Sequence, residues 1–459
     1  MVNLKKSQLN SISNRVKNIL HERIQQEDHL ILGLSGGVDS VVLLNILISF
    51  SLKFRFTLTA LHVNHGISPN AEKWENFCLD LCSTHNIPIK LVKLKINKLS
   101  GISPEANARY ARYKEFENLK ADYVILAQHL DDQAETLLLQ MIRGAGVKGL
   151  SAMPVIRDQI PRDGDQGFVL RPQILRPLLN VSRNEIEDYA REYKLSWVKD
   201  ESNNDISFSR NFLRHKIFPL LETKFPAYRT TFLRTSHHMA EANSLLDDLA
   251  RLDSKKCIIS DRIEIRKFQE LNFLRAKNLL RYDLVRRGMT LPSTAKLEDM
   301  IRQLFTSKLD TKLHIIFGDN EIRTYRGSIY VKRAHKSPNK ELKILWNGEK
   351  KIEITEKGDS VRFLREKGKG INLQKLKKEP IIIRFRSGGE RMRPDFNRPR
   401  RSLKNLFQEK SLPQWERESL PLLFSGEHLV WAPGIGIDCA FQARDSDLGL
   451  IVSWHPNTE

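Results

Sequence analysis

The chain has 459 residues, 40% of them hydrophobic, which is enough for several cores; we expect two or three domains and exclude a disordered chain. Lys and Arg number 75 against 55 Asp and Glu, a formal net charge of +20 that favours a polyanionic partner such as nucleic acid, although net charge also serves solubility. The sequence has no run of 18 apolar residues and no signal-peptide pattern, so we expect no membrane span and a cytoplasmic protein.

The first half of the chain alternates apolar strand patterns with helical patterns. In chain order the expected elements are His29–Leu34 (strand), Val41–Phe50 (helix), Leu58–His65 (strand), Ala71–His85 (helix), Ile87–Ile96 (strand), Pro104–Leu119 (helix), Tyr123–His129 (strand), Asp131 to about Arg143 (helix) and Ser182–Tyr193 (helix). This alternation predicts an α/β fold with a doubly wound parallel sheet. In such sheets ligands bind beyond the carboxyl ends of the strands.

The pattern changes after about Phe218. Tyr228–Leu252 and Ile265–Arg287 are basic and amphipathic, which predicts helices, and Leu313–Val331 predicts two or three short strands. The polar segment His335–Lys340 is typical of a linker. We therefore expect a catalytic domain over residues 1–217, a mainly helical middle domain over 218–335 and a smaller α+β domain over 336–459.

The strongest motif lies between the first predicted strand and its helix. It reads Ser35-Gly36-Gly37-Val38-Asp39-Ser40. Adjacent glycines let backbone N–H groups approach a phosphate at the positive end of a helix, the two serines can donate hydroxyl hydrogen bonds, and Asp39 is a candidate Mg²⁺ ligand. A plain turn with Ser and Asp as helix caps is the alternative, and the position directly after a buried strand favours the phosphate site.

Two further elements carry candidate site residues. Asp131 and Asp132 open the helix that follows the fourth strand, where they could simply cap it. Asp132 and Glu135 are three residues apart and therefore share a helix face, where they could hold an ammonium ion or a metal. Arg109 on the preceding helix could bind a carboxylate or a phosphate through its planar guanidinium group.

Taken together and in this order, these elements resemble the tRNA(Ile)-lysidine synthetase family, whose catalytic domain is a PP-loop ATP-pyrophosphatase domain of the adenine-nucleotide alpha-hydrolase-like fold. The matching motifs are SGGVDS, His62-Val63-Asn64-His65, Glu105–Arg109, His129–Thr136, Arg143-Gly144, Arg176–Leu179, Asp200–Asn203, Arg210–Arg214, Arg386–Arg391, Leu403-Lys404, Pro413–Arg417 and Gly434–Gly436. The chain departs from the family pattern at Gln128, where the family has His, at Ala127, where it has Gly, and at Ser68, where a basic residue is usual.

The resemblance implies a ligase that uses ATP to adenylate the wobble cytidine of a tRNA(Ile) with a CAU anticodon and then attaches free lysine, giving lysidine, AMP and pyrophosphate. It implies that the SGGVDS residues with His65 and His129 bind ATP, that Asp39 holds Mg²⁺, that Asp132 and Glu135 bind the ammonium groups of lysine, and that Arg109 binds its carboxylate. We thus expect catalytic roles for Asp39, Arg109, Asp132 and Glu135.

Candidate tRNA contacts are basic or amide residues near the site and in the last domain, each of which could also be ordinary surface charge. They are Arg143, Arg210, Asn211, Arg214, Arg391, Arg393, Arg401 and Lys404. A homodimer is possible.

Three other functions compete with this interpretation. A PP-loop tRNA thiolase needs a reactive cysteine or an iron–sulfur ligand set, but Cys78 and Cys82 have the wrong spacing and fit buried core positions better. Cys257 and Cys439 lie far along the chain, and the four cysteines imply no disulfide framework, which suits a reducing compartment. A glutamine-dependent amidotransferase needs a glutaminase domain, for which the sequence offers no candidate. A non-enzymatic RNA-binding protein would not need the SGGVDS and DDQAET elements.

Overall fold

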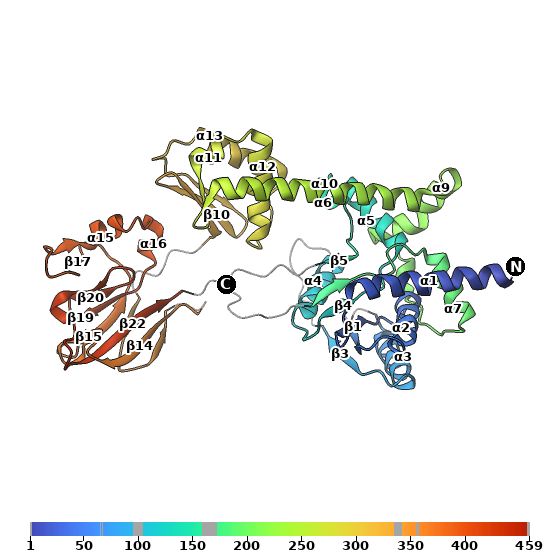
Figure 1. Cartoon of the computed structure of the whole chain (residues 1–459), viewed down its shortest axis with the longest axis horizontal. Coiled ribbons are helices and arrows are strands. Elements are labelled where there is room, and N and C mark those ends of the chain that lie inside the picture. The colour runs from blue at the N-terminus through green and yellow to red at the C-terminus, as the bar shows by residue number, and fades with distance from the viewer. Residues whose placement is uncertain are drawn as a thin grey trace. The chain divides into compact units, whose positions relative to one another are not determined.

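A computed structural model describes residues 2–64, 66, 68–94, 104–157, 172–334, 342–354 and 358–456 (Figure 1). The chain forms two compact units, which divide in sequence between Ala250 and Arg251. The first unit thus continues past the predicted end of the catalytic domain at residue 217, and our division into three domains stays a prediction.

The first unit is built on a six-stranded sheet in the order β3-β2-β1-β4-β6-β5. The strands are β1 (His29–Gly33), β2 (Thr57–Asn64), β3 (Ile89–Lys93), β4 (Tyr123–Ile125), β5 (Ile156–Arg157) and β6 (Gln173–Leu175). All neighbours pair in parallel except β5, which runs antiparallel at the edge. The predicted parallel sheet is confirmed.

Helices cover both faces of this sheet because successive strand residues point to opposite sides. Leu30 and Leu32 of β1 pack in one core with helices α1 (Val2–Arg23), α2 (Val38–Ser51), α3 (Ala71–Thr84) and α7 (Arg183–Glu192). Ile31, between them, packs in the opposite core with Phe116 of α4 (Pro104–Glu117). This two-sided burial is what makes the sheet doubly wound.

Two local features differ from the sequence prediction. Helix α1 was not predicted, although Ile12, Val16 and Leu20 recur every four residues and are all buried, which is the pattern of a helix with one apolar face. Strand β4 ends at Ile125 rather than His129, because the chain turns away from the sheet to begin α5 (Leu130–Ile142). Residues 126–129 therefore form the connection at the carboxyl end of the sheet.

The second unit begins within helix α10 (Tyr228–Cys257) and contains two folded parts. The first combines helices α11 (Ile265–Gln269), α12 (Phe273–Arg286) and α13 (Thr294–Thr306) with a five-stranded sheet of β7 (Ile258–Ile259), β8 (Arg262–Glu264), β11 (Ser328–Arg333), β10 (Asn320–Tyr325) and β9 (His314–Phe317). Strands β9 to β11 confirm the short strands predicted near residues 313–331. Buried apolar residues of the helices and of the sheet form one core.

The last part is rich in strands, with short helices added. One sheet contains β12 (Lys343–Leu345), β16 (Ile381–Arg384), β19 (Leu422–Ser425), β20 (His428–Ala432) and β21 (Gly436–Ile437), and another contains β13 (Lys351–Glu353), β14 (Ser360–Lys367), β22 (Leu448–His455) and β15 (Ile371–Asn372). A two-stranded ribbon, β17 (Arg391–Met392) with β18 (Arg401–Ser402), and helices α14 (Leu373–Leu376), α15 (Leu403–Glu409) and α16 (Gln414–Glu418) complete it. The α+β prediction is confirmed.

Among the described residues, no helix is both long and apolar enough to cross a membrane.

Candidate active site at the carboxyl end of the sheet

The SGGVDS loop connects the carboxyl end of β1 to the first turn of α2, as predicted. Gly36 has a φ of +84°, and a Cβ there would lie 2.8 Å from Cγ2 of Val198, so both the conformation and the space require glycine. Ser40 Oγ donates to the Gly37 carbonyl at 2.9 Å and lies 3.2 Å from Ser35 Oγ. These contacts fix both hydroxyl groups beside the positive end of a 14-residue helix whose N-cap residue, Gly37, supplies no side-chain cap. The loop therefore has the features of an anion site.

His62 supports this loop from the neighbouring strand. Its ring is buried, and Nδ1 lies 2.9 Å from the carbonyl oxygen of Leu34, the residue that precedes the loop. Of the HVxH motif, this histidine thus has a structural contact, whereas His65, predicted to bind ATP, lies outside the described residues.

Asp39 of the loop forms an ion pair with Arg183 at the start of α7. Nη1 of Arg183 lies 2.8 Å from Oδ1 and 2.6 Å from Oδ2 of Asp39, and Nε donates to Glu187 at 2.9 Å. No group of three or more His, Cys, Asp and Glu side chains suited to a metal occurs in the described part of the chain. A single carboxylate fits Mg²⁺, which is usually held by one or two carboxylates together with substrate phosphates and water.

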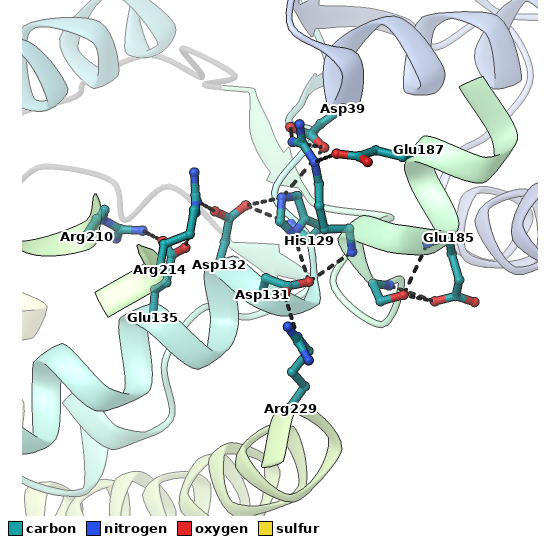
Figure 2. Close-up of polar contacts among 12 residues, drawn as sticks. Asp39, His129, Asp131, Asp132, Glu135, Glu185, Glu187, Arg210, Arg214 and Arg229 are labelled. Atoms are coloured by element: carbon teal, nitrogen blue, oxygen red, sulfur yellow. Dashed lines mark hydrogen bonds and ion pairs between the residues drawn. The ribbon is translucent and has the colours of Figure 1, made fainter. Parts of the chain in front are cut away.

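His129, directly before α5, lies among three carboxylates (Figure 2). Its Nε2 is 3.6 Å from both Asp39 and Asp132, and Nδ1 is 3.7 Å from Asp131. The ring is buried, and among the described residues Nδ1 has no hydrogen-bond partner. The structure therefore brings His129 and Asp132, from one motif, to Asp39 of the other.

Asp131 has a structural role in this cluster. It accepts a hydrogen bond from the backbone N–H of Arg183 at 2.9 Å and another from Nε of Arg229 at 2.5 Å. Burial would raise the pKa of Asp131, but these hydrogen bonds and the nearby positive charges outweigh it and lower the pKa. The carboxylate thereby ties α5 to α7 and α10.

Glu135, three residues after Asp132 on α5, is fully buried and is paired with two arginines. Its Oε1 lies 2.7 Å from Nη2 of Arg214, and its Oε2 lies 3.4 Å from Nη1 of Arg210. Burial and the charge of Asp132 raise the pKa of Glu135, against the opposing effect of the two guanidinium groups. Asp132, whose side chain is 19% exposed, is 3.6 Å from Arg214 and is the more accessible carboxylate of the two.

Three other predicted residues of the first unit lie outside the carboxylate cluster around His129. Arg109 is exposed on α4, where Nη2 donates to the hydroxyl of Tyr113 at 3.2 Å, and Arg143 is exposed at the end of α5. Asn211 is buried and donates its side-chain amide to the carbonyls of Ser202 and Asp205, so its contacts lie inside the protein.

The predicted tRNA residues of the last domain lie on one region of the second unit. Arg391 and Arg401 belong to the β17–β18 ribbon, Arg393 follows β17 and Lys404 lies in the first turn of α15. Lys404 is exposed, and Arg401 is paired with Glu409.

Sequence reasoning missed Arg183 and Arg229, which neutralise Asp39 and Asp131. Arg183 directly follows Ser182, whose predicted capping box with Glu185 is confirmed, but helix periodicity does not reveal a partner 144 positions away. Arg229 lies in a predicted amphipathic helix, where an arginine is ordinarily a surface residue.

Comparison with known proteins identifies the family. The PP-loop domain family matches residues 8–221, the TilS substrate binding domain residues 263–330 and the TilS substrate C-terminal domain residues 381–454. A tRNA(Ile)-lysidine synthase of Nitrosomonas europaea is 47% identical over 95% of this chain and 94% of its own length. The chain belongs to the tRNA(Ile)-lysidine synthase family. The tRNA(Ile)-lysidine synthase of Azoarcus sp. is 37% identical over 92% of this chain and 91% of its own length. The tRNA(Ile)-lysidine synthase of Coxiella burnetii is 35% identical over 92% of this chain and 92% of its own length.

Membership confirms the resemblance stated from the motifs. The chain is an ATP-using PP-loop enzyme of a ligase family that modifies tRNA, and the thiolase alternative has less support. The three matched regions cover, one each, the part of the chain with the SGGVDS loop, the middle part and the last part.

Proposed function

We propose that this protein adenylates the wobble cytidine of a tRNA(Ile) with a CAU anticodon and then joins free lysine to it. The observation that carries the proposal is the meeting of the SGGVDS loop with the Asp132 carboxylate at one edge of the sheet, through His129. Family membership supports the reaction, and the short distances from His129 to Asp39 and Asp132 support a phosphate site next to a site for a cation.

In the first step the 2-carbonyl oxygen of cytidine attacks the α-phosphate of ATP, a P–O bond forms and pyrophosphate leaves. The N–H groups at the start of α2 and the hydroxyls of Ser35 and Ser40 bind the phosphate oxygens, where fixed dipoles stabilise developing negative charge. Mg²⁺, when bound at Asp39, supplies further positive charge to the leaving pyrophosphate. The buried His129 ring, with Nε2 3.6 Å from Oδ1 of Asp39, helps to orient this carboxylate.

In the second step the ε-amine of lysine attacks C2 of the activated base, a C–N bond forms and AMP leaves. Asp132 binds the lysine ammonium group and accepts the proton that the amine must lose. Arg109 binds the α-carboxylate. Glu135, whose oxygens contact Arg210 and Arg214, keeps those guanidinium groups next to the substrate, and with Arg143 they contact tRNA phosphates.

The decisive experiment supplies purified protein with ATP, Mg²⁺ and labelled lysine. We expect label to enter a tRNA(Ile) with a CAU anticodon, with AMP and pyrophosphate released in equal amounts, and none to enter the same tRNA with a GAU anticodon. Absence of label from the CAU substrate would overturn the proposal. Sedimentation of the same preparation tests the homodimer.

The thiolase alternative would require a reactive cysteine thiolate. Burial raises the pKa of Cys78 to about 12 and that of Cys82 to about 11, and a thiol that stays protonated is a poor nucleophile. We expect Cys82→Ala to retain lysine incorporation, whereas a thiolase would lose sulfur transfer.

A further inference from the structure

The carboxyl end of the sheet holds a second cluster, made by arginines around the phenol ring of Tyr113 on α4. The Tyr113 hydroxyl accepts hydrogen bonds from Nη2 of Arg109 at 3.2 Å and from Nη2 of Arg176 at 3.3 Å. The guanidinium carbons of Arg109 and Arg157 lie 5.0 Å and 5.6 Å from the centre of the ring. One phenol group thus contacts three cations by its oxygen and its face.

Arg176 links this cluster to the strand ends. It directly follows β6 and is 2% exposed. Its Nη1 donates to the Pro154 carbonyl at 2.9 Å, and its Nε donates to Oε1 of Gln128. Gln128 immediately precedes His129, so a continuous chain of contacts runs from the end of β4 through Arg176 and Tyr113 to Arg109.

The groups that accept hydrogen bonds from Arg176 in this cluster are neutral. Within the described part of the chain, the hydrogen-bond acceptors of Arg176 are an amide, a carbonyl and a phenol, and no carboxylate is paired with it. Because Arg176 is buried, its charged form is poorly solvated, and this burial lowers the pKa of Arg176. Burial would raise the pKa of Tyr113, but Arg109 and Arg176 outweigh it and lower the pKa. An anion next to Arg109 would therefore be attracted by Arg109 and also by Arg176, whose acceptors in the described part of the chain are neutral.

We infer that Tyr113 and Arg176 are positioning residues that hold the guanidinium group of Arg109 toward the α-carboxylate of the amino-acid substrate. This inference rests on the proposed function and deepens it. The chain of contacts makes carboxylate recognition depend on the Tyr113 hydroxyl, although that hydroxyl need not touch the substrate. Gln128, where the family has His, serves here as the neutral acceptor that fixes Arg176.

The test compares lysine with 1,5-diaminopentane, which has the same reacting amine but no carboxylate. We expect Tyr113→Phe to raise the KM for lysine about ten-fold, the value of roughly one hydrogen bond to a charged group, and to leave the KM for ATP unchanged. The preference for lysine over the diamine, measured as the ratio of kcat/KM values, should fall by a similar factor. Tyr110→Phe is the matched control, because Tyr110 is 64% exposed on the same helix.

A second variant tests the same chain of contacts from another element. Gln128→Leu removes one of the three hydrogen-bond acceptors of Arg176, and the ratio of kcat/KM for lysine to kcat/KM for the diamine should again fall. Thermal unfolding verifies that each variant is folded. An unchanged ratio in folded Tyr113→Phe, or an equal loss for both substrates, would overturn the inference while the proposed function stands. A wild-type protein that joins no lysine would instead overturn the proposed function.

Discussion

Arg183 at the first position of α7 holds both carboxylate oxygens of Asp39, at 2.6 and 2.8 Å, at the first turn of α2. A positive charge at a helix N-terminus is unfavourable, and the negative charges of Asp39 and Glu187 offset this cost for Arg183. Conversely, a second cation at Asp39 would share the carboxylate oxygens with Arg183. The Arg183–Asp39 ion pair therefore links α7 to the SGGVDS loop.

Asp39→Asn should strongly impair the first step. The substitution keeps the size of the side chain but removes the charge that balances Arg183 and that would hold Mg²⁺. We expect pyrophosphate release with tRNA present to fall on the order of 100- to 1,000-fold, the usual loss on removing one preorganised electrostatic group. Asp80→Asn, an exposed carboxylate on α3, is the control and should release pyrophosphate at the wild-type rate.

Asp132→Asn should separate the two steps. The loop and Asp39 remain in place, so adenylation, measured as pyrophosphate released without lysine, should continue. The KM for lysine should rise by roughly 10- to 100-fold, because the ammonium group loses a charged partner. Equal loss of both steps would show that Asp132 acts in adenylation or in folding instead.

Asp131→Asn should change the pH dependence of stability. Because the folded pKa of Asp131 is lowered, its carboxylate stabilises the native state above the ordinary value of 3.8, and this stability is lost as the pH falls through the folded pKa. We expect the variant to be less stable by about 2 kcal/mol at pH 7, the value of a hydrogen bond to a charged group. The difference should shrink below about pH 4.

Denaturant titration at several pH values measures this difference. Asp188→Asn, whose side chain is 57% exposed in a pair with Arg191, serves as the control, and we expect it to change stability little at any pH. A constant difference across the whole range would contradict the role assigned to Asp131.

The β17–β18 region should contribute to tRNA binding through phosphate contacts. Each contact removed lowers the slope of log Kd against log salt by about one, so Arg391→Gln with Lys404→Gln should lower it by about two. Filter binding at several salt concentrations measures the slope. Lys369→Gln is the control in the same domain, because Lys369 is already paired with Glu366 at 2.6 Å. An unchanged slope in the double variant would assign these residues to ordinary surface charge.

The sequence by itself determined the parallel sheet, the loop after β1 and the acidic start of α5, because each depends on local periodicity, glycine and helix-end chemistry. It placed Asp132 and Glu135 on one helix face, and three-residue spacing guarantees that. Motif order also indicated the family, which the comparisons confirm.

Only the tertiary structure decided how the charges are paired. Glu135 is sealed between Arg210 and Arg214, Asp39 is held by Arg183, and Asp131 is held by Arg229, across separations of 75 to 144 positions. No local pattern specifies such partners, since an arginine on an amphipathic helix has the same spacing whether it faces water or a carboxylate. The burial of each carboxylate is set by how α5, α7 and α10 pack, and that packing determines which acid stays open to a substrate.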